Sequence, residues 1–198
     1  GETYTITYDV DYGETISKDG SASLNNTAIG FKGNAQKSSS HVYTEISKKI
    51  IEKLGWVTDN NTMIQWNIKV NPDRMDGVAG EYTLKDVLKK GDSDVGLDLE
   101  KAEGFKITET DKNGKSTVVT DTAYKDGKLT IKDGCSYEIT YKTPVTGDEG
   151  AKHTYNNEAS LDGGGKDYSG SATVTVTVPS GVKKEGKGTQ KATADTAV

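Results

Sequence analysis

Strict alternation of apolar and polar residues is the feature that most narrows the folds open to this chain. The segment IQWNIKVN, residues 64–71, has apolar residues, beginning with Ile64 and Trp66, at every second position. The segments YEITYKT at 137–143 and TVTVTV at 173–178 follow the same period. Because successive side chains of a β-strand point to opposite faces, this period predicts strands with one buried and one solvated face.

Shorter segments predict further strands, and turn dipeptides separate them. The additional strand candidates are residues 4–10, 104–108, 116–120 and 128–132. Turn signals stand at Asp19-Gly20, Asn113-Gly114, Asp126-Gly127 and Asp133-Gly134. The stretch TDKNGKST at 110–117 therefore predicts a hairpin. Residues 82–92, YTLKDVLKKGD, are expected to form a strand followed by a helical turn.

The composition agrees with a thin β-protein. Only 32% of the 198 residues are hydrophobic, and 23 are glycine, so many strand faces must be solvated. A net charge of −5 argues against a nucleic-acid partner. The chain has no run of 18 apolar residues, so we expect no membrane insertion in this segment. Its single cysteine, Cys135, cannot form a disulfide within the chain and is expected to be buried.

An internal repeat sets the organisation of the chain. Asn26-Thr-Ala matches Asn157-Glu-Ala at an offset of 131, and Lys53-Leu-Gly matches Lys184-Glu-Gly at the same offset. A YTITY segment near the start matches YEITY at 137–141 at nearly that spacing. Repeated units at one period indicate tandem domains of about 131 residues.

The repeat divides the chain into three parts. Residues 1–45 are expected to be the C-terminal strands of a preceding repeat, residues 46–180 a complete repeat, and residues 181–198 a linker and the first strand of a following one. The segment EISKKIIEKLG at 45–55 has apolar residues at helical spacing. Its counterpart in the repeat, PSGVKKEGKG, is a poor helix, so we interpret 45–55 as the end of one strand, a crossing and the start of the next.

The order of these elements resembles a known family. Lys53-x-Gly, IQWNIKVN, YTLKDVL, YEITYKT, YNNEASL and TVTVTV together look like the immunoglobulin-like repeats of Gram-positive surface adhesins of the collagen-binding type. The resemblance covers about residues 48–180, and more weakly 1–45. It implies an all-β, immunoglobulin-like β-sandwich with additional strands, the DEv-IgG type. It also implies an extracellular location at the bacterial cell surface, anchored to the cell wall through parts outside this chain.

In that family many domains carry a spontaneous isopeptide bond between a lysine on the first strand and an asparagine on a late strand. The resemblance implies that Lys53 is the nucleophile, Asn157 the electrophile and Asp86 the proton shuttle. Asn156 is an alternative to Asn157. Two further lysines, Lys49 and Lys69, are alternatives to Lys53.

This chemistry requires these residue types in a buried setting. The lysine must be neutral to attack, and burial lowers its pKa. A protonated aspartic acid must polarise the amide, and desolvation raises the pKa of the acid. The ordinary alternatives are a solvated strand-end Lys53, an Asp86 that caps a turn, and an Asn157 amide that bonds to the backbone.

The sequence holds no complete set of crosslink residues for the two outer copies. Asn26 has no counterpart of Lys53 upstream in its own unit, and Lys184 has no asparagine downstream. A bond between Lys184 of one molecule and Asn26 of another is conceivable, but no strand bearing an aspartate completes that site.

No functional site is expected at the other polar clusters. The acidic segment 92–98 lacks the glycine placement of an EF-hand and is expected to be a solvated loop. His41 and His153 are too few for a metal site and are expected at the surface. GGGKDYSG at 163–170 is expected to be a flexible hairpin. We expect no cofactor and no metal.

These observations favour a structural stalk or adhesive repeat of a bacterial surface protein, stabilised by the Lys53–Asn157 bond. The alternative is a ligand-binding module of an adhesin that recognises a host extracellular-matrix protein such as collagen. The expected partners are neighbouring repeats of the same polypeptide and, in the alternative, the matrix protein. No residue set supports an enzyme; formation of the crosslink would be a single-turnover reaction of the chain on itself.

Overall fold

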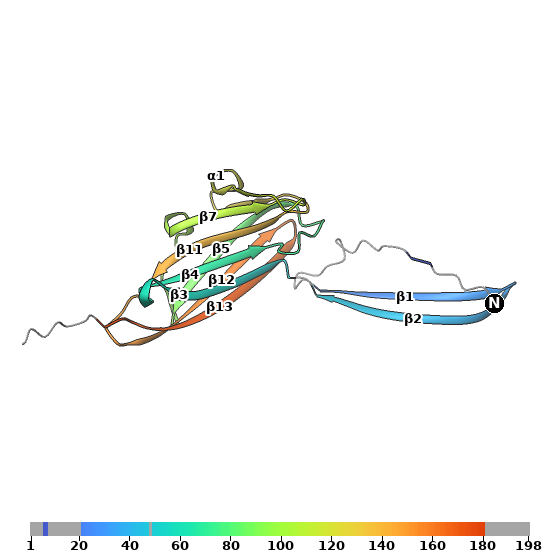
Figure 1. Cartoon of the computed structure of the whole chain (residues 1–198), viewed down its shortest axis with the longest axis horizontal. Coiled ribbons are helices and arrows are strands. Elements are labelled where there is room, and N and C mark those ends of the chain that lie inside the picture. Colours follow the sequence, from blue (N-terminus) through green and yellow to red (C-terminus); the bar gives the residue numbers. More distant parts are fainter. Residues whose placement is uncertain (1–5, 8–20, 48, 181–198) are drawn as a thin grey trace, which may run out of the picture.

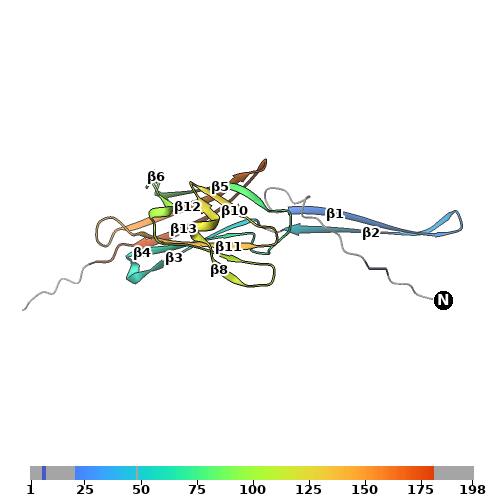
Figure 2. The same cartoon turned by 90° about the horizontal axis from the view of Figure 1, so that it is seen from above.

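The computed structural model describes residues 6–7, 21–47 and 49–180. Two antiparallel strands, β1 (Ser21–Lys32) and β2 (Ala35–Ser47), form a sheet of their own. In Figures 1 and 2 this ribbon extends away from one end of a β-sandwich formed by the later strands.

One sheet of the sandwich has five strands in the order β3-β4-β11-β7-β8. All neighbouring pairs in it are antiparallel. The strand bounds are β3 Ile51–Thr58, β4 Met63–Val70, β7 Glu103–Thr110, β8 Ser116–Val118 and β11 Ser136–Pro144.

The second sheet has the order β13-β12-β5-β10-β9, with β6 paired to β5. It is antiparallel throughout. The strand bounds are β5 Gly80–Lys90, β6 Ser93–Asp94, β9 Tyr124–Lys125, β10 Lys128–Ile131, β12 Lys152–Gly163 and β13 Lys166–Thr177. Within residues 49–180, three short helices lie in the connections: η2 Asp59–Asn61, η3 Leu99–Lys101 and α1 Thr120–Ala123.

The core lies between the two sheets and follows the alternation seen in the sequence. The Trp66 side chain is completely buried, as are its period-two neighbours Ile64 and Ile68. In β13 the valines at 174 and 176 are buried while the alternating threonines at 173, 175 and 177 are exposed. The sandwich therefore has one apolar face for each sheet, turned toward the other sheet.

The predicted all-β sandwich is confirmed, and most predicted strands are present. The hairpin expected at 110–117 connects β7 to β8. Residues 45–55 are not helical, because β2 ends at Ser47 and β3 begins at Ile51. The strand predicted at 4–10 lies outside the described residues apart from Ile6 and Thr7, which have no regular structure.

One local prediction was wrong, and another strand is shorter than predicted. Residues 82–92 do not end in a helical turn, because β5 continues to Lys90 and pairs with β12 as far as Tyr155. Its buried residues Leu84 and Leu88 are four apart, a spacing shared by a helix turn and a strand. The strand predicted at 116–120 ends at Val118, and Thr120 begins α1 instead.

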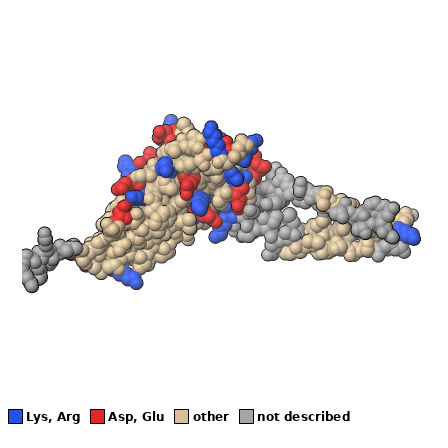
Figure 3. Space-filling model, in the orientation of Figure 1, with Lys and Arg blue, Asp and Glu red and all other residues tan. Residues whose placement is uncertain are grey.

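The surface is mixed in charge. Figure 3 shows acidic and basic side chains interspersed over the upper part of the sandwich, and few charges over its lower part. The exposed threonines of β13, Thr173, Thr175 and Thr177, are uncharged surface residues. In the described part of the chain, no helix has the length and hydrophobicity needed to cross a bilayer.

Candidate functional site

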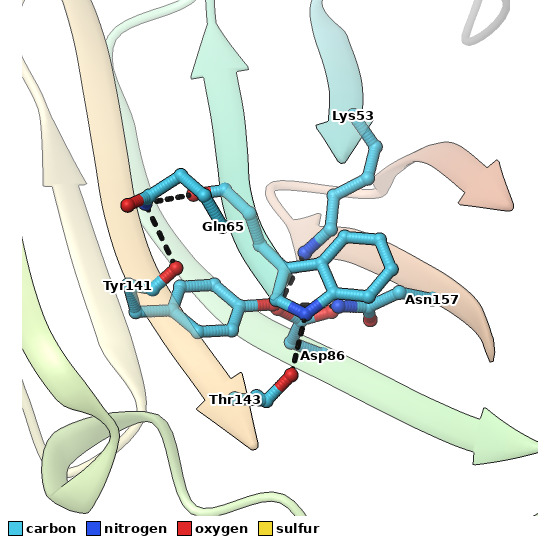
Figure 4. Close-up of polar contacts among 7 residues, drawn as sticks. Lys53, Gln65, Asp86, Tyr141, Thr143 and Asn157 are labelled. Atoms are coloured by element: carbon cyan, nitrogen blue, oxygen red, sulfur yellow. Dashed lines mark hydrogen bonds and ion pairs between the residues drawn. The ribbon is translucent and has the colours of Figure 1, made fainter. Parts of the chain in front are cut away.

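Four polar side chains meet between the sheets (Figure 4). Lys53 on β3 and Tyr141 on β11 come from the five-stranded sheet, and Asp86 on β5 and Asn157 on β12 come from the facing sheet. Each of the four lies on the face of its strand that points into the core, together with buried apolar residues. Asn157, for example, lies on the same face of β12 as Tyr155 and Ala159. The strand period therefore carries polar groups into the core at this level.

The contacts converge on the Tyr141 hydroxyl. Lys53 Nζ donates to Tyr141 Oη at 2.6 Å, and Asn157 Nδ2 donates to the same oxygen at 2.7 Å. Tyr141 in turn donates to Asp86 Oδ2, which also lies 2.6 Å from Lys53 Nζ. The sum of the two distances to Tyr141 Oη is therefore the upper limit on the separation of the lysine and asparagine nitrogens.

The site is buried and lined by aromatic rings. The side chains of Lys53 and Asp86 are completely buried, and Asn157 is 1% exposed. Lys53 Nζ lies 5.7 Å from the centre of the Trp66 ring and 4.9 Å from that of Tyr141. Trp66 is held in turn by a 2.8 Å hydrogen bond from Nε1 to Thr143 Oγ1.

A glycine beside Lys53 makes room for the tryptophan. A Cβ on Gly55 would overlap the Trp66 ring, because strand pairing puts these two residues opposite each other. The Lys53-x-Gly pattern thus has a packing reason: the glycine lets the indole lie against β3.

Burial moves both ionisable partners toward their neutral forms. Desolvation lowers the pKa of Lys53 to about 8, although the attraction of Asp86 acts in the opposite direction. Desolvation likewise raises the pKa of Asp86 above its ordinary value, against the effects of Lys53 and Tyr141. The pKa of Tyr141 is raised by burial and by the neighbouring Asp86, so its hydroxyl stays protonated.

Two buried oxygens of the site have no hydrogen-bond partner: Asp86 Oδ1 and Asn157 Oδ1. Both are acceptors while Asp86 is ionised, and an unsatisfied buried acceptor is costly. A proton on Asp86 would turn its carboxyl group into a donor suited to an amide oxygen. The cluster can therefore hold an amine, an acid and an amide together, which are the reactants for transfer of the amide to the lysine.

The structure brings Lys53, Asp86 and Asn157 together and leaves their alternatives outside. Asn156 is exposed and accepts a hydrogen bond from Thr173 Oγ1 at 2.8 Å. Lys49 is exposed. Lys69 is out of phase with the buried Ile68 and Val70 of its strand and is only half-buried.

Tyr141 is the member of the site that sequence reasoning missed. The alternating pattern identifies it only as a residue of a predicted strand. A signal was available, since Tyr141 shares the phase of Tyr137 and Ile139 and so had to face the core. Its hydroxyl required a partner there.

The other described residues that the sequence analysis singled out lie away from this cluster. Asn26 is exposed on β1, and Lys184 lies outside the described residues. Asp92, Asp94 and Asp98 are exposed, and the described ranges hold no group of three or more metal-ligating side chains.

The two histidines differ in their surroundings. His41 is exposed and its Nδ1 lies 2.8 Å from Thr27 Oγ1. His153 is half-buried, contrary to the expected surface position, because the β11–β12 connection around Gly147 covers its ring. Cys135 is buried, as predicted.

Comparison with known families identifies the class of protein. The model of the collagen-binding domain family matches residues 48–169, which is more than half of the chain and nearly all of the sandwich up to β13. The chain therefore belongs to the collagen-binding domain family of adhesins. No curated protein matches it.

Similar solved structures come from surface proteins of three bacteria. A collagen-binding domain from a Staphylococcus aureus adhesin is 21% identical, with 65% of this chain and 99% of that chain covered and a TM-score of 0.44. The Enterococcus faecalis adhesin ACE is 13% identical (78% and 60% covered, TM-score 0.45). The collagen-binding domain of Erysipelothrix rhusiopathiae surface protein RspB is 10% identical (78% and 60% covered, TM-score 0.42).

Proposed function

We propose that this chain is an extracellular adhesive module that binds a host matrix protein of the collagen class. The observation that carries this proposal is the family match over residues 48–169. It favours a ligand-binding module over a purely structural stalk, the role that the repeat suggests first. A stalk remains the second candidate because of the 131-residue period in the sequence.

We further propose that the sandwich is closed by an isopeptide bond between Lys53 Nζ and Asn157 Cγ. The support is the burial of both residues and their common hydrogen-bond partner, Tyr141 Oη. Groups held in contact in a dry site react with a high effective concentration. The lowered pKa of Lys53 and the raised pKa of Asp86 favour the neutral forms that the reaction needs.

The reaction begins with proton transfer from Lys53 to Asp86 Oδ2, the contact of 2.6 Å. The neutral amine attacks Asn157 Cγ, and the protonated Asp86 donates to the amide oxygen as negative charge develops there. Asp86 then delivers its proton to the amide nitrogen and accepts the second proton of the attacking amine, which leaves the new amide with one N–H. The C–N bond to that nitrogen breaks, ammonia leaves, and a new C–N bond joins the two side chains. Tyr141 keeps the amine and the amide in place throughout.

The bond would join the two sheets across the core and close a loop of the 104 positions from Lys53 to Asn157. By the loop-closure argument applied to disulfides, a covalent loop of that length removes about 4–5 kcal/mol of unfolded-chain entropy. Such a contribution suits a chain that is only 32% hydrophobic. A pulling force on the ligand-bound module would then meet a covalent connection between strands β3 and β12.

Binding of the purified chain to immobilised triple-helical collagen tests the adhesive role. Saturable binding to collagen, with none to an albumin surface, is the expected result. The Asn157→Ala variant separates recognition from crosslinking, because Asn157 is 1% exposed and cannot be a surface contact. A folded chain that binds neither collagen nor other matrix proteins would contradict the adhesive role and leave the stalk.

A further inference from the structure

The isolated ribbon β1–β2 corresponds to β12–β13, the closing hairpin of the sandwich, when the two are compared at the 131-residue period of the sequence. β1 covers residues 21–32 and β12 covers 152–163, an offset of 131 at both ends. β2 starts at Ala35 and β13 at Lys166, again 131 apart. Both hairpins are closed by a two-residue turn containing glycine with positive φ, at Gly33 in one and at Gly164 in the other.

The pairing around the two asparagines is also alike. Asn157 lies opposite Ala172 in the sandwich, and Asn26 lies opposite Val42 in the ribbon, where a register shift between Gly30 and Phe31 changes the offset of the paired residue from 131 to 130. Ala159 faces Gly170 across the same strand pair, and its counterpart Ala28 faces Ser40. One face of the ribbon therefore presents small and apolar residues around an asparagine, in the arrangement that the sandwich buries.

The surroundings of the two hairpins differ. In the sandwich, β12 pairs with β13 along one edge and with β5 along the other, where Asn157 lies opposite Leu88. Gly170 of β13 lies close to the backbone of β3, where an added Cβ would be 3.2 Å from Ile51 O. In the part of the chain that the structure describes, β1 pairs only with β2.

The face of the ribbon that corresponds to the buried one is open to solvent. Val42 is 56% exposed, and Asn26 and Ala28 are also exposed. A two-stranded hairpin is marginally stable in water without a sheet or core to pack against. An open edge with apolar residues on one face is typical of a strand pair that docks onto another sheet.

We propose that the Asn26–Val42 face of β1–β2 docks onto an open β-sandwich of the same repeat that lacks its own closing hairpin. Such a partner offers an edge strand equivalent to β5 for pairing with β1. It also offers a lysine and an aspartate equivalent to Lys53 and Asp86. In the docked state Asn26 is the acceptor of a second isopeptide bond, a step that depends on the crosslinking chemistry proposed above.

The second bond would form by the same balanced step. The partner's neutral lysine attacks Asn26 Cγ, the partner's aspartate carries the lysine proton to the amide nitrogen, and ammonia leaves. No oxidant or cofactor is required.

The test is a tandem chain in which a second copy of residues 49–133 precedes Gly1 of the full chain. Gly1-x-x-Tyr4 matches Gly134-x-x-Tyr137, so this junction rebuilds one complete repeat that ends in β1–β2. The expected mass is lower than the calculated one by two molecules of ammonia, and the Asn26→Ala variant is expected to lose only one. Loss of one ammonia by both forms would overturn Asn26 as an acceptor.

Limited proteolysis tests docking separately from the bond. Cleavage within residues 33–47 is expected to be about tenfold slower or more in the tandem chain than in the original, because docking protects the backbone. Val42→Lys should abolish this protection. Tyr43→Lys, a change at a similarly exposed residue on the opposite face, should preserve it.

Cleavage at the same rate in both chains would overturn docking, whether the added strands are folded or not. Protection without any loss of ammonia, in the tandem or the original chain, would support docking and contradict only the isopeptide chemistry.

Discussion

Lys53 Nζ lies 2.6 Å from Asp86 Oδ2, and these completely buried side chains come from opposite sheets of the sandwich. A buried ion pair of this kind is often no more stable than an apolar pair of the same shape. An asparagine oxygen without a hydrogen-bond partner, Asn157 Oδ1, is buried in the same cluster. The pair provides an amine with a nearby base and an amide with a nearby acid.

Replacement of Asp86 by asparagine keeps the size of the side chain and removes the proton carrier. We expect the Asp86→Asn chain to keep its full mass, because Lys53 cannot pass its proton on and the amide is not polarised. Lys53 is also left buried without a counter-charge, which costs about 3–5 kcal/mol when one partner of a buried pair is removed. Denaturant unfolding measures this cost, and intact mass reports the crosslink.

The exposed pair Lys128–Glu81 is a suitable control. Glu81→Gln should still lose one ammonia relative to its calculated mass. Its free energy of unfolding should be nearly that of the wild type, because exposed pairs contribute little. Loss of ammonia by Asp86→Asn at the wild-type rate would show that the carboxyl group is not required.

Tyr141→Phe removes the hydroxyl shared by Lys53 and Asn157 while keeping the ring. We expect the crosslink to form about tenfold to a hundredfold more slowly, since the amine and the amide lose their common anchor. The rate of ammonia loss after cell-free synthesis is the measurement. Tyr155→Phe is the control, because that buried hydroxyl bonds to the Thr146 backbone, away from the site. An unchanged rate in Tyr141→Phe would exclude a positioning role.

The rate of crosslinking should depend on pH through the Lys53–Asp86 pair. The reactive form holds one proton, on Asp86, while Lys53 is neutral. Above the lowered Lys53 pKa of about 8 this last proton is lost, and the rate should fall about tenfold per pH unit. Below the raised Asp86 pKa both groups are protonated, so the rate should fall again.

Freshly synthesised chain, incubated at a series of pH values and sampled by mass spectrometry, gives this profile. A rate that keeps rising from pH 8 to 10 would contradict it, because that is the behaviour of a free amine acting without the acid.

Gly55→Ala tests the packing beside the site. The added methyl group overlaps the Trp66 ring, which must move away from β3 and from Lys53. We expect a loss of about 1–3 kcal/mol in the free energy of unfolding, the usual cost of overpacking. Leu54→Ala, at the neighbouring exposed position, should have a much smaller effect. Equal effects of the two changes would mean that the contact with Trp66 does not matter.

The strands of the sandwich were predictable where alternation was strict. β4 and β11 lie within a residue or so of the segments predicted for them, because Trp66, Ile139 and their neighbours mark a single buried face. β5 was only partly predicted, since its pattern of leucines and lysines satisfies a helix turn as well as a strand. Pairing with β12 decides the matter, and that contact between distant segments is not visible in the local pattern.

The family resemblance singled out three residues that the structure brings together in the buried cluster, and strand phase would have separated them from their alternatives. Asn157 is in phase with Tyr155 and Ala159, whereas Asn156 is not. The role of Tyr141 could not be foreseen in the same way. It depends on a hydroxyl from one sheet reaching groups of the other, which only the packed sandwich reveals.

The intact mass of the purified chain is the most direct test of the proposed crosslink. The account predicts a mass lower than the calculated value by one molecule of ammonia, with the full mass restored in both Lys53→Ala and Asn157→Ala. A wild-type chain of full calculated mass would contradict it.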